Sequence, residues 1–468
     1  MKIYTAFGIL FLTGCGVQSN YERPCTTIPE NWRFETATTG EIANLAWWEQ
    51  FQDPVLNDLI QSALDCNNDL AAASARVMEF YARYWMVFAK QLPELGLSWN
   101  MDRYKLPEIP NLLPFIPEIP RTNWLYDFFL TMSYEVDFWG KMKYASESQM
   151  AEYLAEVDGR KSVLLSLVSS LAKAYIQLRQ YDNQLDIAKQ TLETRKDAWE
   201  IANKRYDAGL VSYMEVKQAE SEALRAETEV KNLEVFIAHQ EDAISVLTGK
   251  PPGQIARGIH LTELQLPSIP TGLPSDLLQN RPDIMKAEQK LISAHAQIGV
   301  AKATFFPSIA LTGVLGNVST MLENFFSNPS SFFDFGLRTF QDLFKGGGNI
   351  NNFKRSQAVA LEAVHNYQQT ILTALQEVEN ALISHKKTKE KLEIQKQTSA
   401  ALEEYRRLSL LRYENGQNDY LTVLDAEKGL FQAQLDQTSV QAEVFLTFID
   451  LYKALGQGWQ IDCQNREL

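Results

Sequence analysis

The sequence predicts an α+β membrane protein built as a tandem duplication, with paired β-strands and one very long helix in each half. All seventeen prolines lie before residue 121 or between 251 and 329, which leaves two long stretches where uninterrupted helices can form. Segments of alternating apolar and polar residues precede each predicted helix. Two sixteen-residue stretches, RYDAGLVSYMEVKQAE at 205–220 and RYENGQNDYLTVLDAE at 412–427, match at seven positions with an offset of 207.

The chain begins with a targeting segment. Residues 3–12 are apolar, but a helix needs about 20 such residues to cross a bilayer, so 1–14 is predicted to be a signal peptide. The motif LTGC, which ends at Cys15, resembles a bacterial lipobox and implies cleavage before Cys15 and lipidation of that residue. By the same resemblance, Gly16 favours the outer membrane. Residues 15–52 are then a lipidated linker.

Two segments of the first half, 94–105 and 124–138, alternate apolar and polar side chains and are rich in aromatic residues. Weaker versions occupy 307–318 and 331–342. This pattern is typical of membrane-barrel strands, and a pair of hairpins on a soluble sheet is the alternative. The targeting segment favours the membrane.

Four strands cannot close a barrel by themselves. Open sheet edges are not tolerated in lipid, and the smallest barrels have about eight strands. The chain must therefore oligomerise if its strands lie in a membrane. A dimer gives eight strands with a packed interior, whereas a trimer gives twelve and room for a pore.

Long helices are predicted at about 140–207 and 350–414. In the first helix, apolar residues recur every seven positions, which keeps one seam against a neighbouring helix. At about 1.5 Å per residue this helix is roughly 100 Å long. The seam is formed by Leu164, Leu171, Leu178, Leu185, Leu192, Trp199 and Tyr206.

Each long helix ends in the quoted repeat. Gly209 and Gly416 stand where a left-handed C-cap is expected, and Ser212 and Asp419 stand where the next helix needs an N-cap. Each segment is thus a helix-turn-helix tip followed by a return helix.

The repeat extends beyond the tips, because Asp69, Pro93 and Leu97 match Asp283, Pro307 and Leu311 at an offset of 214. The predicted organisation is a first repeat, a linker, a second repeat and a tail. Their bounds are 53–250, 251–280, 281–455 and 456–468.

Composition excludes several classes of protein. A net charge of -14 argues against a nucleic-acid partner. Four cysteines are too few for a disulfide framework, and any pairing among Cys25, Cys66 and Cys463 stays open. No two histidines have helical metal-site spacing, and no phosphate loop or nucleophile motif is present. The sequence therefore predicts no enzyme and no cofactor apart from the lipid on Cys15.

Several motifs together resemble the TolC/OprM-type outer-membrane efflux channels, especially the lipidated NodT-like branch that serves RND pumps. They run in the family's order over nearly the whole mature chain. These motifs are Trp47-Trp48-Glu49-Gln50-Phe51, Asn68-Asp69-Leu70, Tyr134-Glu135-Val136-Asp137-Phe138-Trp139-Gly140-Lys141, Arg281-Pro282-Asp283-Ile284, Phe305-Phe306-Pro307, Glu377-Val378-Glu379-Asn380-Ala381-Leu382 and both tips.

The resemblance implies a homotrimer with a twelve-stranded outer-membrane β-barrel, four strands per chain, continued by a long periplasmic α-helical barrel. The linker at 251–280 and the tail would form part of an equatorial belt. The implied function is the passive exit duct of a tripartite efflux pump, with a periplasmic adaptor and an inner-membrane RND-type pump as partners. A duct for type I protein secretion shares this fold. A periplasmic coiled-coil lipoprotein would leave the alternating segments unexplained.

The same resemblance places the tips at the far periplasmic end, where the family docks its adaptor and narrows its pore. Asp425 matches a pore-facing acid, so a trimer would carry one ring of three carboxylates that attracts cations. A solvated helix face or a local salt bridge is the alternative for Asp425. Asp419 is a second gate candidate or a helix cap, and Tyr213 and Tyr420 either plug the ring or pack between helices. The implied adaptor-docking residues are Gly209, Leu210, Val211, Gly416, Gln417 and Asn418.

Overall fold

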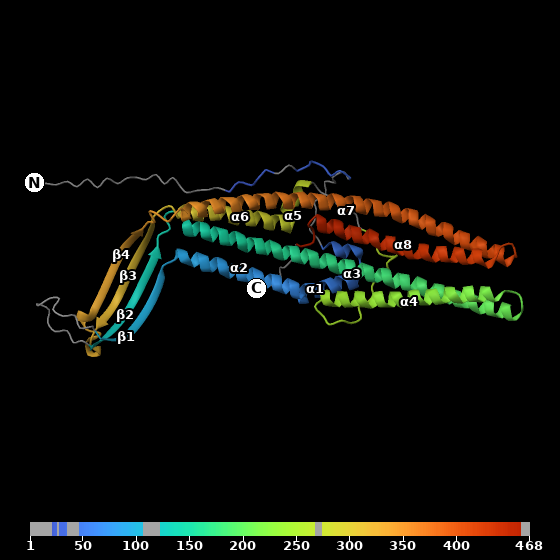
Figure 1. The fold of residues 1–468 in the computed structure, drawn as a ribbon, viewed down its shortest axis with the longest axis horizontal. Coiled ribbons are helices and arrows are strands. Elements are labelled where there is room, and N and C mark those ends of the chain that lie inside the picture. The colour runs from blue at the N-terminus through green and yellow to red at the C-terminus, as the bar shows by residue number, and fades with distance from the viewer. Residues whose placement is uncertain (1–20, 26–27, 35–45, 106–121, 267–273, 460–468) are drawn as a thin grey trace, which may run out of the picture. The chain divides into compact units, whose positions relative to one another are not determined.

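The computed structural model describes residues 21–25, 28–34, 46–105, 122–266 and 274–459 (Figure 1). Predictions for the signal peptide, Cys15, Cys463 and most of the tail lie outside these residues. The elements in chain order are α1 (Pro54–Cys66), α2 (Asn68–Phe88), β1 (Glu94–Lys105), β2 (Thr122–Glu135), α3 (Lys141–Asp207), α4 (Tyr213–Leu247), α5 (Leu277–Asn280), α6 (Pro282–Ala303), β3 (Ser308–Ser319), β4 (Ser331–Phe340), α7 (Gly348–Glu414) and α8 (Tyr420–Ala454), with short 3-10 turns between some of them.

The duplication is visible in the lengths of the elements. Helices α3 and α7 each have 67 residues, and helices α4 and α8 each have 35. Strands β1 and β3 each have 12. Helix α6 and strand β3 start 214 residues after α2 and β1, whereas α7 and α8 start 207 residues after α3 and α4. The change in spacing therefore falls between the two strands of each hairpin.

The four strands form one antiparallel sheet in the order β1-β2-β3-β4. Its register places Trp99 opposite Phe128, and Leu315 opposite both Leu130 and Phe333. One face is therefore mostly apolar, and the other carries most of the polar side chains. The apolar face contains Leu95, Leu97, Trp99, Met101, Tyr126, Phe128, Leu130, Met132, Leu311, Leu315, Phe333, Phe335 and Leu337.

The apolar face is exposed in the single chain, as expected for strands that face lipid. Leu97 and Trp99 are 68% and 63% exposed although both are large and apolar. In water such a face would be a strong aggregation site. Among the described helices, none is long and apolar enough to cross a membrane.

The chain divides into two compact units. The first contains the described parts of 1–25, 77–155 and 287–367, which include the whole sheet. The second contains those of 26–76, 156–286 and 368–468, which include both tips. Each unit draws on both repeats, since α3 and α7 run from one unit into the other.

The second unit has an aromatic core that explains the double-tryptophan motif. Trp47 stacks on Tyr452 of α8 with ring centroids 5.6 Å apart, and Phe51 contacts Phe448 edge-on at 5.5 Å. All four side chains are buried and pack with residues of α1, α3 and α4. The motif therefore anchors the N-terminal linker to the helices of the second unit.

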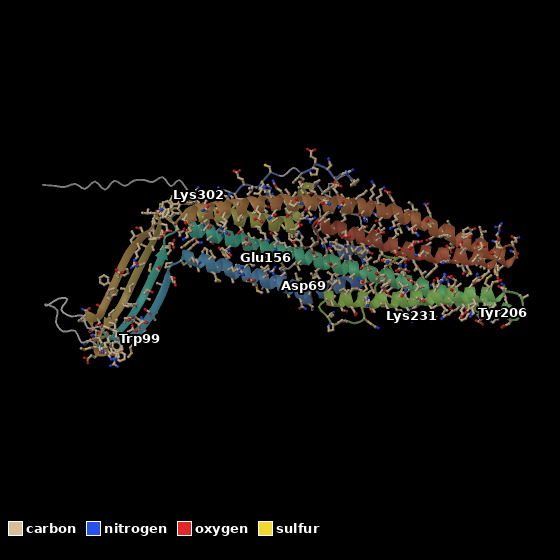
Figure 2. The ribbon with its side chains drawn as sticks, viewed as in Figure 1. Asp69, Trp99, Glu156, Tyr206, Lys231 and Lys302 are labelled. Carbon is tan, nitrogen blue, oxygen red and sulfur yellow. The ribbon has the colours of Figure 1, made fainter. Side chains whose placement is uncertain are left out.

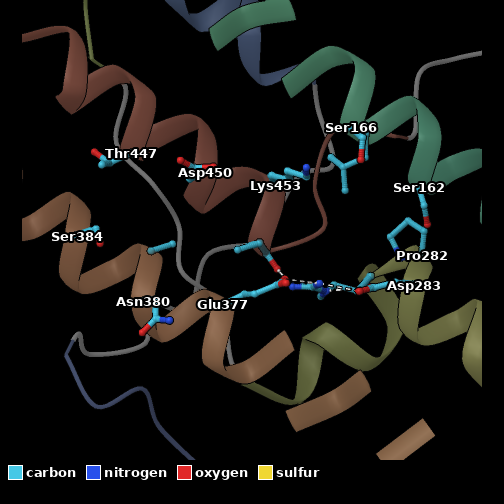
Figure 3. A pocket seen from close by; sticks show the side chains of 14 residues that line it. Ser162, Ser166, Pro282, Asp283, Glu377, Asn380, Ser384, Thr447, Asp450 and Lys453 are labelled. Carbon is cyan, nitrogen blue, oxygen red and sulfur yellow. Dashed lines mark hydrogen bonds and ion pairs between the residues drawn. The ribbon is translucent and has the colours of Figure 1, made fainter. Parts of the chain in front are cut away.

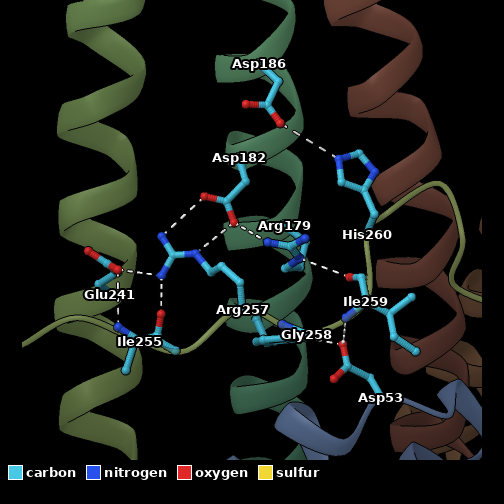
Figure 4. A network of polar contacts seen from close by, with 11 residues as sticks. Asp53, Arg179, Asp182, Asp186, Glu241, Ile255, Arg257, Gly258, Ile259 and His260 are labelled. Atoms are coloured by element: carbon cyan, nitrogen blue, oxygen red, sulfur yellow. Dashed lines mark hydrogen bonds and ion pairs between the residues drawn. The ribbon is translucent and has the colours of Figure 1, made fainter.

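A network of hydrogen bonds and ion pairs fastens residues 255–260, part of the linker at 251–280, to α3 and α4 (Figure 4). The buried Asp53 carboxylate caps α1 and accepts hydrogen bonds from the Tyr175 hydroxyl at 2.7 Å and the Ile259 amide at 3.1 Å. Arg257 pairs with Asp182 of α3 at 3.0 Å and Glu241 of α4 at 2.5 Å. These bonds hold the linker on the surface of the second unit.

Candidate functional site: the paired helix tips

The first tip turns through a Schellman motif. The amides of Gly209 and Leu210 donate to the carbonyls of Tyr206 and Arg205 at 2.8 and 2.9 Å. Gly209 has a φ of 71°, which favours glycine because a Cβ is strained there. Ser212 then caps α4 by accepting from the Glu215 amide at 3.4 Å. Tyr206 marks this end of α3 in Figure 2.

The second tip repeats that backbone. The amides of Gly416 and Gln417 donate to the carbonyls of Tyr413 and Arg412, both at 2.9 Å, and Gly416 has a φ of 69°. Asp419 caps α8 by accepting from the Thr422 amide at 3.3 Å and from its hydroxyl at 2.9 Å. The carboxylate of Asp419 is therefore engaged in holding the helix start.

The implied docking residues lie on these two turns, and most are open to solvent. Leu210 is 74% exposed. Gly209, Gly416 and Gln417 are exposed, whereas Val211 and Asn418 are half-buried. Added Cβ atoms at the two glycines meet nothing within 4 Å, so the backbone angle alone demands glycine.

The candidate gate residues separate into two groups. Asp425 is exposed, and its carboxylate makes no hydrogen bond or ion pair with any residue in the described ranges. Tyr213 is 55% exposed and contacts Tyr206 with ring centroids 5.4 Å apart. Tyr420 instead packs on the Val216 cluster, formed by Ala202, Val216 and Ala219 in the first helical hairpin, α3–α4. Burial raises the pKa of Tyr420 to about 12. Asp425 and Tyr213 are thus accessible, while Tyr420 joins two hairpins.

One polar contact bridges the tips directly. The Arg205 guanidinium donates to the Tyr413 hydroxyl at 2.9 Å and lies 5.6 Å from the centre of that ring. Both residues belong to the repeated positions of the sequence, but the pattern alone gave them no partner. Their contact shows that the end of α3 and the end of α7 meet side by side.

A buried charge cluster lies farther from the turns and links the same two hairpins. Arg195 of α3 is 6% exposed, pairs with Glu222 of α4 at 3.2 Å and lies 5.3 Å from the ring of Phe431 in α8. Burial lowers the pKa of Arg195. Burial also raises the pKa of Glu427 in α8, although Arg195 and Arg406 act in the opposite direction.

A cavity of about 600 Å³ in the second unit, lined by polar and apolar side chains, is the other candidate site (Figure 3). Arg281 at its edge is bonded to Asp283 at 2.7 Å, to Glu377 at 2.6 Å and to the Ala454 carbonyl at 2.8 Å. Arg281 and Glu377 come from two of the sequence motifs, and the fold brings them together. Arg281 is paired with both Asp283 and Glu377, so this cluster clamps α6, α7 and α8 together.

No group of three or more metal-ligating side chains occurs within the described ranges. Cys25 and Cys66 are free and exposed. The tips are therefore the feature that the duplication, the exposure and the inter-hairpin contacts all single out.

Comparison with known proteins identifies the family. Residues 59–250 and 273–457 match the family model described as outer membrane efflux protein. The chain belongs to this family. The outer membrane efflux protein match covers both repeats and both tips.

Individual relatives agree over nearly the full chain. "Probable efflux pump outer membrane protein TtgC" of Pseudomonas putida is 30% identical over 462 residues, covering 97% of this chain and 94% of that protein. "Cation efflux system protein CusC" of Escherichia coli is 30% identical over 463 residues, covering 96% and 97%.

Solved structures show the same fold. The outer-membrane channel OprN has a TM-score of 0.88 at 27% identity, covering 96% of this chain and 100% of that one. The Neisseria gonorrhoeae MtrE outer membrane channel has a TM-score of 0.85 at 28% identity, covering 95% and 99%. The predicted fold class, a trimeric channel to which each chain gives four strands and long helices, is confirmed.

The predicted efflux function in the outer membrane is also confirmed at the level of the family. These relatives favour efflux over a protein-secretion duct and over a coiled-coil spacer. They are named as channels and pump components, which agrees with the absence of enzyme motifs in the sequence.

Proposed function

We propose that this chain is the exit duct of a tripartite efflux pump, anchored by lipid on Cys15 and gated at its helix tips. A periplasmic adaptor would dock on the tips, and an inner-membrane RND-type pump would supply the driving force. The observation that carries the proposal is the second tip, where the accessible Asp425 follows a capped turn in a family of outer-membrane efflux proteins.

The proposed mechanism places the gate at the tips. The duct conducts passively and does no covalent chemistry. In the trimer three Asp425 carboxylates face one axis, and together they attract cations and repel anions. Opening separates the hairpins at the tips, which breaks the exposed contact between Arg205 and Tyr413 first because water competes with it.

Conductance of the purified trimer in a planar bilayer tests the gate. We expect small, rare openings in the wild type. Asp425→Ala should enlarge them and lower the preference for cations over anions by roughly a factor of two to ten.

The repeat supplies a matched control for this experiment, since Gln218 stands 207 residues before Asp425. Gln218→Ala removes a side chain of similar size without removing charge, and it should leave ion selectivity unchanged. A wild-type selectivity that survives Asp425→Ala would place the selective ring elsewhere.

The contacts of the N-terminal segment support the lipid anchor. Arg23, eight residues after Cys15, forms a bidentate ion pair with Glu288 of α6 at 2.7 and 2.6 Å. Tyr21 donates to the same carboxylate at 3.3 Å. Residues 21–25 are thereby held on the first unit, which also contains the sheet.

Labelling with radioactive palmitate tests the anchor. We expect incorporation into the wild type and none into Cys15→Ser, while Cys25→Ser and Cys66→Ser keep the label. Equal labelling of Cys15→Ser would exclude lipidation at this residue.

A further inference from the structure

The sheet ends in two unpaired edges, at β1 and at β4. In a closed trimer these edges must meet, because a barrel in lipid leaves no backbone edge exposed. Strand β4 of one copy therefore pairs with β1 of the next. The register of that junction follows from the internal duplication.

The two β-hairpins of the chain, β1–β2 and β3–β4, have equivalent strand registers. Leu97 lies opposite Leu130 in the first hairpin, and Leu311 lies opposite Leu337 in the second. Leu311 is 214 residues after Leu97, and Leu337 is 207 residues after Leu130. The offsets that relate the helices therefore relate the strands as well.

The junction between the two hairpins is β2 against β3. It pairs Phe129 with Gly316, Leu130 with Leu315, and Thr131 with Val314. Advancing by one β-hairpin along the barrel replaces β2 by β4 and replaces β3 by β1 of the next copy. Each residue of β2 moves forward by 207 positions and each residue of β3 moves back by 214.

We propose that this operation gives the subunit junction of the barrel: Leu337 pairs with Met101 of the partner subunit, Arg338 with the partner's Asn100, and Gly336 with the partner's Asp102. The proposal rests on the trimer and not on the conduction or gating of the channel.

The two faces of the sheet agree with this register. Leu337 and Met101 both belong to the apolar face, and Arg338 and Asn100 both belong to the polar face. A slip of one residue would turn every side chain of one strand to the wrong face. A slip of two residues keeps the faces but would pair Leu337 with Trp99 or Arg103 of the partner subunit.

Charge gives a second, independent argument for the junction. The side chains of Arg338 on the β4 edge and Asp102 on the β1 edge each lack a hydrogen bond or ion pair with any described residue of their own chain. In the proposed register they are diagonal neighbours on adjacent strands, with backbones about 7–8 Å apart, a distance that a long arginine side chain spans. Gly336 stands directly opposite the partner's Asp102 and leaves room for the ion pair.

Paired cysteines test the register in the trimer. In a background where Cys25, Cys66 and Cys463 are serine, Leu337→Cys with Met101→Cys samples one class of strand pair. Phe340→Cys with Ser98→Cys samples the other class, because hydrogen-bonded and non-bonded pairs alternate along the ladder. After oxidation in membranes, we expect covalent dimers and trimers on non-reducing gels for at least one of these pairs.

Shifted pairs supply the control. Leu337→Cys with Trp99→Cys, and Leu337→Cys with Arg103→Cys, keep the face but change the register by two residues. We expect at least tenfold less cross-linking from them than from the best matched pair. Stronger cross-linking of a shifted pair, or none from any pair in a trimer verified by gel filtration, would overturn the proposed junction.

A charge exchange tests the ion pair separately from the cysteines. Arg338→Asp and Asp102→Arg should each lower the temperature at which the trimer dissociates, because like charges then meet at the junction. The double variant should recover at least half of the loss. Additive losses in the double variant would show that the two residues are not neighbours.

Discussion

The two helical hairpins, α3–α4 and α7–α8, pack their helices together through different kinds of side-chain contact. In the first hairpin, Arg195 of α3 forms a buried ion pair with Glu222 of α4. The positions 207 residues later are Leu402 of α7 and Gly429 of α8. There the leucine side chain lies 3.3 Å from the place where a Cβ on Gly429 would stand. A charged contact in one repeat is therefore an apolar contact of a large and a small residue in the other.

This difference shows what the duplication has kept. Helix lengths, turn geometry and strand register recur, but the side chains that join helices have diverged. The ionic version also reaches beyond its own hairpin, since Arg195 lies over Phe431 of α8. Arg195 thus links the first helical hairpin, α3 and α4, to α8 of the second.

The largest expected effect is that of breaking the ion pair on one side. Arg195→Leu leaves the half-buried Glu222 with Arg225, at 2.7 Å, as its one cation partner among the described residues. Removing one member of a buried pair costs about 3 kcal/mol or more, and the remaining arginine should limit the loss to about 2 kcal/mol. The midpoint of heat-induced unfolding, followed by circular dichroism, measures this loss.

The second hairpin suggests the variant that compensates. Arg195→Leu with Glu222→Ala copies the apolar contact of α7 and α8 into the first hairpin. Replacing both charges by a packed apolar pair should bring stability to within about 1 kcal/mol of the wild type. If the double variant is no more stable than Arg195→Leu alone, the loss comes from the interactions of Arg195 with Glu427 and Phe431 of α8 and not from the stranded Glu222 carboxylate.

A smaller effect separates the two tips. Asp419 accepts two bonds at the start of α8, whereas Ser212 accepts one long bond at the start of α4. We expect Asp419→Ala to cost about 1 kcal/mol and Ser212→Ala about 0.5 kcal/mol. Amide hydrogen exchange in the first turns of α4 and α8 measures both caps in one experiment. Faster exchange at α4 than at α8 in the respective variants would reverse this ranking.

Much of this fold could be predicted because its signals are local and repeated. Proline distribution located the long helices, alternation located the strands, and Gly209 and Gly416 located the turns. The strand pattern predicted residues 94–105, and the structure places β1 at Glu94–Lys105. The need for further chains followed from the four strands and the nature of lipid.

The contacts between hairpins could not be predicted from these patterns. Arg195 and Glu427 look like ordinary charged residues of a helix face, and their burial depends on how α3 approaches α8. Arg205 and Tyr413 were visible as repeated residues, but a match in sequence does not say which repeat supplies the partner. Tyr420 of α8 packs on the Val216 cluster because the two helical hairpins meet there, which the sequence pattern does not reveal.

The equal lengths of α3 and α7 have an evolutionary consequence. A single inserted residue in α3 would turn its last side chains by about 100° and move its tip by about 1.5 Å relative to the tip of α7. The same insertion in α7 would restore the match. Changes of length in these helices should therefore be inherited in pairs, whereas the loops between paired strands, where the two repeats already differ in length, can change one at a time.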